Sequence, residues 1–193
     1  MSKTIFANLI LTNLQGAIGH DSSQYTNATS TLAQSAIATA ITQYLIANTT
    51  ITISYNGVLT NGGADVIASD TMKIAGTCAT LSIPSDFNSW VAALQSSIAS
   101  SFVVTPPSTQ GVITTFQPFN SAVGALQISQ SDLKTAHNNN IKAPALSVWE
   151  VICGKILDWL NSSSGKNPAA TAITATRTGV SSGTATLVSI SVS

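Results

Sequence analysis

Residues 22–64 contain no Asp, Glu, Lys or Arg. The scarcity extends to the whole chain, in which 7% of residues are charged, against roughly 25% in an ordinary soluble domain. Hydrophobic residues make up 44% of the 193 positions, which is enough for a folded chain with a real core. Interface cores are depleted of charge. The composition therefore favours a subunit packed against copies of itself, with an unusually neutral secreted monomer as the alternative.

The charge balance argues against two classes of partner. Seven basic and seven acidic residues cancel, and the two types are scattered along the chain. Nucleic-acid surfaces need clustered Lys and Arg to neutralise phosphates, and anionic membrane surfaces need the same. No stretch of 18 purely apolar residues is present, so we expect no transmembrane helix. The sequence predicts no nucleic-acid recognition and no membrane association.

The N-terminal segment, MSKTIFANLILTNLQGAIG, superficially resembles a signal peptide. Asn8, Thr12 and Asn13 interrupt its apolar run, and it lacks an A-x-A cleavage pattern. Its apolar residues alternate as on one face of a strand, at Ile5, Ala7, Leu9 and Leu11. We therefore expect residues 1–20 to form a retained N-terminal strand or arm.

Three amphipathic helices are predicted from apolar residues that recur at helical spacing. They cover residues 31–47, 86–101 and 144–160, with Ser85 or Asp86 as a cap of the second and Pro144 in the first turn of the third. A fourth, shorter helix is expected at 131–137. The rest of 117–145 gives no clear pattern.

Strands are predicted between and after these helices. Ile51, Ile53 and Tyr55 alternate with polar residues, and Asn56-Gly57 is a strong turn signal. The chain is expected to end in a β-hairpin at about 170–193. Because GTCATLSI at 76–83 is similar to GTATLVSI at 183–190, a repeated helix–strand–strand unit is suggested.

Together these elements predict a single α+β domain over residues 1–193, with amphipathic helices packed on mostly antiparallel strands. The two cysteines, Cys78 and Cys153, offer only one possible bridge. Cys153 lies within an apolar helical stripe, where a free cysteine acts as a small hydrophobic residue. We expect both thiols to be reduced and buried.

The sequence contains no recognisable catalytic, metal-binding or cofactor-binding motif. His20-Asp21 is the sole adjacent histidine–carboxylate pair, and a polar turn is the simpler interpretation. His137 precedes three asparagines, which favours a loop. The histidines and cysteines lack zinc-site spacing, and the carboxylates are dispersed. NGGAD at 61–65 suits a hairpin loop better than an anion nest or calcium loop. The sequence therefore predicts no catalytic residue, metal site or cofactor.

The C-terminal twenty residues, TATRTGVSSGTATLVSISVS, carry a single charge. Such a segment pairs readily with an open strand edge. Alternation puts Leu187 on one face with two serines, and Val188, Ile190 and Val192 on the other, which we take as buried. These four residues, at positions 187, 188, 190 and 192, are the candidate subunit interface. An open edge becomes a contact between subunits when a neighbouring copy supplies the missing strand.

In its residue composition, the chain resembles the structural proteins of tailed-bacteriophage virions. The residues that carry the resemblance are the low-charge, Thr/Ser/Ala/Asn-rich segments 1–20, 50–60, 76–83 and 170–193. The resemblance implies a non-enzymatic subunit of the neck, tail or baseplate, forming a ring or tube with copies of itself and contacting other virion proteins. It also implies a location in the virion, after assembly in the host cytoplasm.

Two other classes remain open at this point. A secreted or cell-surface adhesion module would expose its Ser/Thr-rich strands and bind as a monomer. A small hydrolase would use His20 or His137, although no motif supports it. Oligomer formation by the purified protein would separate the hypothesis of a self-associating virion subunit from these two.

Overall fold

A computed structural model describes most of the chain. The described residues are 3–19, 27–59, 65–83, 85–105, 112–113, 116–119, 124–162, 165–166, 173–176 and 180–192.

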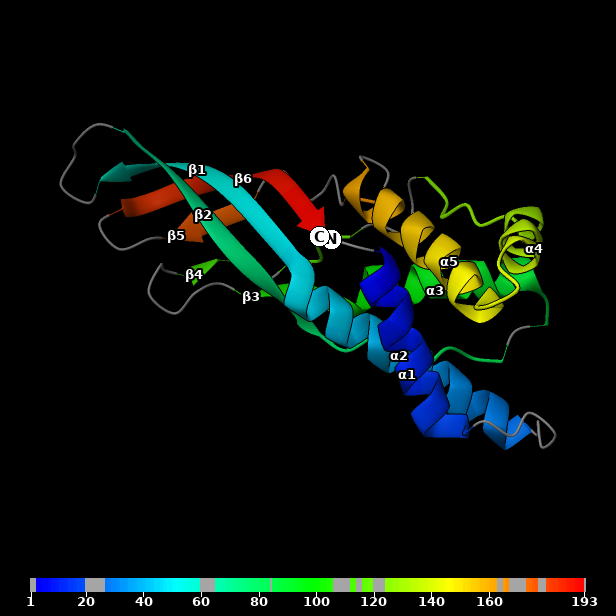
Figure 1. Cartoon of the computed structure of the whole chain (residues 1–193). Coiled ribbons are helices and arrows are strands. Elements are labelled where there is room, and N and C mark those ends of the chain that lie inside the picture. Colours follow the sequence, from blue (N-terminus) through cyan, green and yellow to red (C-terminus); the bar gives the residue numbers. More distant parts are fainter. Residues whose placement is uncertain are drawn as a thin grey trace.

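The fold is α+β, as the sequence predicts. Helices gather at one end of the elongated molecule and strands at the other (Figure 1). In chain order the elements are α1 (Lys3–Ile18), α2 (Asn27–Asn48), β1 (Thr49–Leu59), β2 (Asp65–Gly76), α3 (Phe87–Ser101), β3 (Phe102–Thr105), β4 (Val112–Ile113), α4 (Gln130–Asn139), α5 (Pro144–Asn161), β5 (Ile173–Thr176) and β6 (Val180–Val192). This order contains the helix–strand–strand succession three times, starting at α2, α3 and α5.

The strands form one sheet in the order β3-β2-β1-β6-β5-β4, and every pair is antiparallel. The three long strands β2, β1 and β6 lie together at the centre. The flanking strands are much shorter, with four residues in β3, two in β4 and four in β5. The sheet is therefore long in the middle and short at its flanks.

Two helices run into strands without a loop. α2 ends at Asn48 and β1 begins at Thr49, while α3 ends at Ser101 and β3 begins at Phe102. The Thr- and Ile-rich sequence after Asn48 favours the extended backbone. At the second junction Gly76 is required, because a Cβ built there would lie 2.0 Å from the Ser101 carbonyl oxygen and φ is +133°. The junctions fix the helices directly to the base of the sheet.

The core lies where the helices meet the base of the sheet. Phe6 of α1 stacks on Tyr44 of α2, with ring centroids 4.1 Å apart. Phe102 and Phe119 make an edge contact at 6.1 Å. From the sheet, Ile51 and Ile190 are cross-strand partners and both are buried. This single core joins the helical end to the sheet.

The predicted N-terminal strand or arm is wrong, because residues 3–18 form helix α1. α1 packs against α2 and α5. Its buried side chains are Phe6, Ala7 and Ile10, which follow the spacing of one helical face. The alternation of apolar residues wrongly predicted a strand because α1 has apolar residues on several faces. Ile5 is 54% exposed although Phe6 is fully buried.

The helices predicted over 31–47, 86–101, 131–137 and 144–160 correspond to α2, α3, α4 and α5. The Asp86 cap is confirmed, since its carboxylate accepts a hydrogen bond from the Ser89 N–H at 2.9 Å. The turn predicted at Asn56-Gly57 is wrong. Both residues lie inside β1, where they pair with Ile67 and Val66 of β2. Pairing on both sides of β1 overrides the local turn preference.

The chain ends in an antiparallel pair, β5 and β6, within the range predicted for a hairpin. Val180 already begins β6, and Gly183 pairs with Ala175 of β5. β6 lies between β1 and β5, and is therefore an inner strand of the sheet.

Candidate functional site

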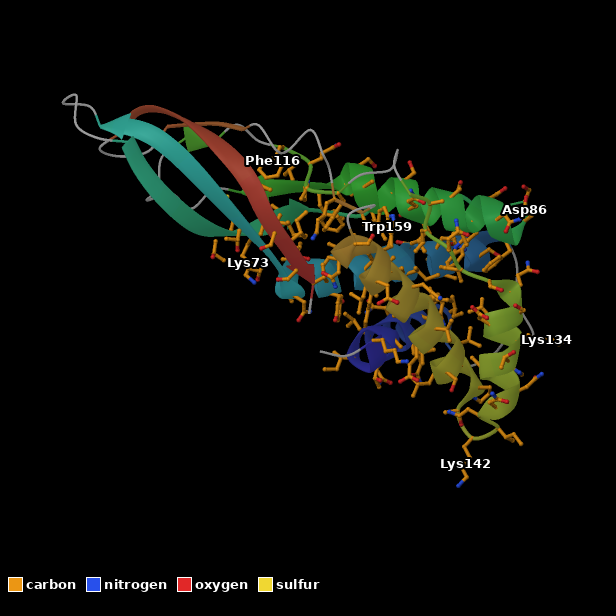
Figure 2. All side chains as sticks on the ribbon, turned by 90° about the horizontal axis from the view of Figure 1, so that it is seen from above. Lys73, Asp86, Phe116, Lys134, Lys142 and Trp159 are labelled. Carbon is orange, nitrogen blue, oxygen red and sulfur yellow. The ribbon has the colours of Figure 1, made fainter. Side chains whose placement is uncertain are left out.

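The titratable side chains do not converge. Figure 2 shows Asp86, Lys134 and Lys142 at separate points of the helical end, far from Lys73 at the sheet. His137 lies exposed on α4 with its Nδ1 3.3 Å from the Asn138 side-chain oxygen. His20, Asp21 and residues 61–64 lie outside the described residues. Within the ranges given above, no group of three His, Cys, Asp or Glu side chains could hold a metal ion.

The two carboxylates with clear partners have structural roles. Asp86 accepts hydrogen bonds from the Ser89 backbone and hydroxyl, and these bonds hold the pKa of its carboxyl below the ordinary aspartate value. Glu150 of α5 accepts a hydrogen bond from the Thr4 hydroxyl of α1. The first caps a helix and the second ties two helices together.

Both cysteines are free and buried, as predicted. Burial raises the pKa of the Cys78 thiol, which lies 3.1 Å from the Ser97 hydroxyl. Burial raises the pKa of Cys153 still more strongly, and the nearby Glu150 carboxylate adds to the shift. A nucleophilic cysteine needs the opposite effect, a lowered pKa in a partly exposed, cationic setting. Both thiols are therefore core groups.

The four C-terminal residues predicted as a subunit interface divide into two pairs. Ile190 and Val192 are buried, 3% and 6% exposed, while Ser191 is exposed. The predicted buried face is correct here, but the chain's own core buries it, so these two side chains have little surface to offer another copy. The side chains of Leu187 and Val188 lie outside those described.

A shift in strand register changes the alternation predicted for this segment. β6 pairs Ser189 with Thr52 and Leu187 with Ile53, so Val188 is the extra residue of a β-bulge. Cross-strand partners share a face. The prediction that Leu187 alternates in step with Ser189 is therefore wrong, because a bulge moves every residue before it by one place in the ladder.

The end of β6 is closed by a side chain. The Asn161 side-chain nitrogen donates to the Val192 carbonyl oxygen at 3.1 Å, and the Val192 N–H donates to the Asn161 side-chain oxygen at 2.9 Å. A primary amide offers the same donor and acceptor as a peptide group. Asn161 thus takes the place of a neighbouring strand. Nothing in the local sequence pattern around Asn161 indicates this role.

Within the described residues, β3 covers only part of the outer edge of β2. β3 pairs with residues 73–76 of β2, from Lys73 opposite Thr105 to Gly76 opposite Phe102. Among the described residues, nothing pairs with residues 65–72 on that side. The residues that would extend β3 along this edge are Pro106 and Pro107, which have no N–H to donate to a ladder. That proline pair is the sequence signal that could have located the open edge.

Exposed apolar side chains also lie at the helical end. Large apolar side chains that remain more than 45% exposed are Ile5, Leu32, Ile83 and Ile141. A hollow of about 380 Å³ lies beside the C-terminal half of α1, and it is lined by Leu11, Leu14, Gln15, Ile18 and Gly19. A smaller hollow of about 210 Å³ lies between α3 and residues 125–128. In the second, the Gln95 side-chain oxygen already accepts the Leu126 N–H at 2.7 Å.

No helix in the described part of the chain is both long and apolar enough to cross a membrane. Comparisons with protein-family models, with curated proteins and with solved structures found no match to this chain.

Proposed function

We propose that the chain is a non-enzymatic structural subunit that assembles with copies of itself into a ring or tube of a tailed-bacteriophage virion, in the neck, tail or baseplate. The self-association rests on the molecule's physical surface. The virion assignment rests on the resemblance in composition alone, and contacts with other virion proteins belong to that assignment.

The observation that carries the self-association is the uncharged surface of α1 and α2. Lys3 is the sole charged residue within these two helices. Leu32, in register with the buried stripe of α2, is nevertheless 52% exposed, and Ile5 on α1 is 54% exposed. A lone exposed apolar residue needs no explanation, but an apolar surface without charges around it favours burial against another protein.

The non-enzymatic part of the proposal is supported by the arrangement of titratable groups. Catalytic groups need pKa values tuned to their task and close mutual geometry. Asp86 is a cap, Glu150 joins two helices, and the thiols have raised pKa values. Self-association needs none of these groups to react.

The test is the mass and shape of the purified full-length chain. Light scattering after size-exclusion chromatography gives the subunit number, and negative-stain electron microscopy shows whether the particles are rings or tubes. A defined oligomer supports the proposal, whereas a monomer at every concentration up to the solubility limit contradicts it. His137→Ala is expected to leave the oligomer unchanged, because His137 lies exposed on α4.

A further inference from the structure

We propose that Ile141 of one copy inserts into the hollow between α3 and residues 125–128 of a second copy, in a head-to-tail contact that repeats around the ring. This inference rests on the proposed self-association and names the two surfaces that mediate one of its contacts. The occupant of the hollow is the isoleucine side chain of a second copy of this chain.

Ile141 projects from the turn between α4 and α5. Its side chain is 90% exposed, more than any other large apolar side chain that the structure describes. Asn140 holds this turn, because its side-chain oxygen accepts the Ala143 N–H at 3.1 Å and its side-chain nitrogen donates to the Ser147 hydroxyl at 2.7 Å. Pro144 then begins α5. Because the turn is already ordered, inserting Ile141 into a partner costs little loop entropy.

The hollow between α3 and residues 125–128 has a volume of about 210 Å³, and all the residues that line it belong to the described part of the chain. Val91, Leu126 and Ile128 are buried around it and give it apolar walls. Gln95 of α3 accepts the Leu126 N–H at 2.7 Å, which holds the segment beside the helix. A cavity of about 150 Å³ holds a benzene molecule, so this hollow has room for the smaller side chain of isoleucine.

Helix α4 keeps Ile141 away from the hollow of its own copy. The helix begins at Gln130, just after Ile128 of the hollow, and ends at Asn139, just before Ile141. Its 10 residues span about 15 Å at 1.5 Å per residue. Because a single side chain does not reach that far, Ile141 can enter only the hollow of another copy.

The charges around the two surfaces favour the same contact. The turn that carries Ile141 also carries Lys142, which is exposed and lies at the tip of the helical end in Figure 2. The hollow has two exposed carboxylates near it. Asp86 caps α3 just before Asn88 of the lining, and Asp132 lies in the first turn of α4. Opposite charges bring the turn of one copy to the hollow of another, whereas two turns facing each other would bring lysines together.

Because the two surfaces differ, the contact between them is head-to-tail. Repeating a head-to-tail contact gives a closed ring when the rotation between copies closes, and a helical assembly when it does not. A contact between two identical surfaces would stop at two copies. The contact of Ile141 with the hollow therefore fits a ring or tube, and it leaves the uncharged surface of α1 and α2 for a separate contact.

The first test changes one side of the contact at a time in the full-length chain, with the subunit number measured by light scattering and sedimentation. Ile141→Asp is expected to weaken association about tenfold or more, because it replaces the apolar side chain with a charge that the nearby carboxylates repel. Ala92→Phe is expected to have a similar effect, because Ala92 is exposed on α3 and lines the hollow, which the ring would fill.

Conservative variants at the same two positions are the matched controls. Ile141→Val keeps an apolar side chain on the turn, and Ala92→Ser keeps the hollow open. Both are expected to stay within about threefold of the original affinity.

A mixing experiment tests whether the contact is head-to-tail. Ile141→Asp keeps an intact hollow, and Ala92→Phe keeps an intact Ile141. An equal mixture is therefore expected to form a one-to-one pair that neither variant forms alone, measured by sedimentation and native mass spectrometry. Circular dichroism checks that each variant is folded. If one is not, Ile141→Ser or Asn88→Trp, at the same turn and at another exposed position of the hollow, takes its place.

The outcomes separate this contact from the broader proposal. An oligomer unchanged by the turn variant or by the hollow variant, or a mixture that forms no pair, would overturn the head-to-tail contact and leave the proposed self-association standing. A wild-type chain that is monomeric at every concentration would overturn both.

Discussion

The helical end and the sheet end of this molecule satisfy their polar groups in different ways. At the helical end, the Trp90 and Trp159 indole N–H groups find partners at 3.1 and 2.9 Å, the Gln34 side chain and the Gly124 carbonyl oxygen. The backbone of each helix is bonded within the helix. At the sheet end, the long strands β1, β2 and β6 depend on neighbours, and the flanking strands are too short to cover them.

The difference shows where a chain with so few charges can associate. A helix whose apolar side is packed has no backbone groups left to pair, so further contacts must come from side chains. A strand at the edge of a sheet presents unpaired N–H and C=O groups. We therefore expect side-chain substitutions to affect mainly the stability of the helical end and the base of the sheet.

The largest effect should come from placing a charge at the base of the sheet. Ile190→Lys puts an unpaired ammonium at a position that is 3% exposed, and we expect a loss of about 5 kcal/mol in the free energy of unfolding. Urea denaturation measures it. Ser191→Lys, one residue on and exposed, is the control and should change little. Equal effects of the two variants would mean that the sheet base is not packed like the helical core.

A large effect is also expected in α1, where the sequence suggested an arm. Phe6→Ala removes a fully buried ring stacked on Tyr44, and should cost about 4 kcal/mol of unfolding free energy. Ile5→Ala is the matched control, because Ile5 is 54% exposed, and it should stay within about 0.5 kcal/mol. If Phe6→Ala were as mild as its control, α1 would be peripheral and the helical end less cohesive than proposed.

The Asn161 contact joins the two regions and should have an intermediate effect. Asn161→Ala leaves the Val192 N–H and carbonyl without their partners, so we expect a loss of about 2 kcal/mol. Hydrogen exchange of the Val192 amide should also quicken relative to its neighbours in β6. Asn138→Ala on the exposed face of α4 serves as the control. An unprotected Val192 amide in the wild-type chain would contradict the strand-like role of Asn161.

A smaller and pH-dependent effect is expected at the first turn of α3. Because hydrogen bonds lower the pKa of Asp86 in the folded state, its contribution is full above the ordinary aspartate pKa of 3.8 and is lost as the pH falls through the lower folded-state value. Asp86→Ala should therefore destabilise the chain at pH 7 and make little difference in strong acid. Unfolding curves at both pH values measure this. A difference that stays constant with pH would exclude the ionised cap.

The smallest effect is expected where the helical end fails to satisfy a polar group. The Tyr44 hydroxyl is buried without a hydrogen-bond partner among the described residues, and burial raises its pKa. Tyr44→Phe keeps the stacking on Phe6 and removes this group, so the unfolding free energy should stay unchanged or rise by up to about 1 kcal/mol. Thermal unfolding measures it. A loss above about 2 kcal/mol would reveal a partner that the structure lacks.

The spacing of apolar residues was sufficient to predict much of the helical end. The apolar stripe of α5, including Ile152, Ile156 and Trp159, was predicted from spacing and is buried as expected. Ser85 or Asp86 was predicted as the cap of α3, and the structure shows that Asp86 has this role. For α1 the same approach failed, because apolar residues occupy several of its faces and the packing of α2 and α5 against it selects which are buried.

For the candidate site, the sequence predicted a pairing edge in the C-terminal segment, and among the described residues β5 covers only positions 183–185 of β6. The low charge and strong β preference of β6 are real properties of the sequence, yet β6 lies between β1 and β5. Which strand becomes an edge depends on pairings between residues far apart in the chain. In composition the two strands differ, since β2 carries Asp65, Asp70 and Lys73 while β6 carries no charged residue.

By itself, the sequence determined the α+β class, most helix positions and the buried state of both cysteines, because these depend on periodicity and residue type over one or two turns or strands. The tertiary structure alone decided that the N-terminal segment is helical, that Asn56-Gly57 stays extended, and that Ile190 and Val192 face the chain's own core. In each case the local preference is worth about 1 kcal/mol or less. Burial of a large apolar side chain is worth about 2 kcal/mol, and so long-range packing prevails over local preference.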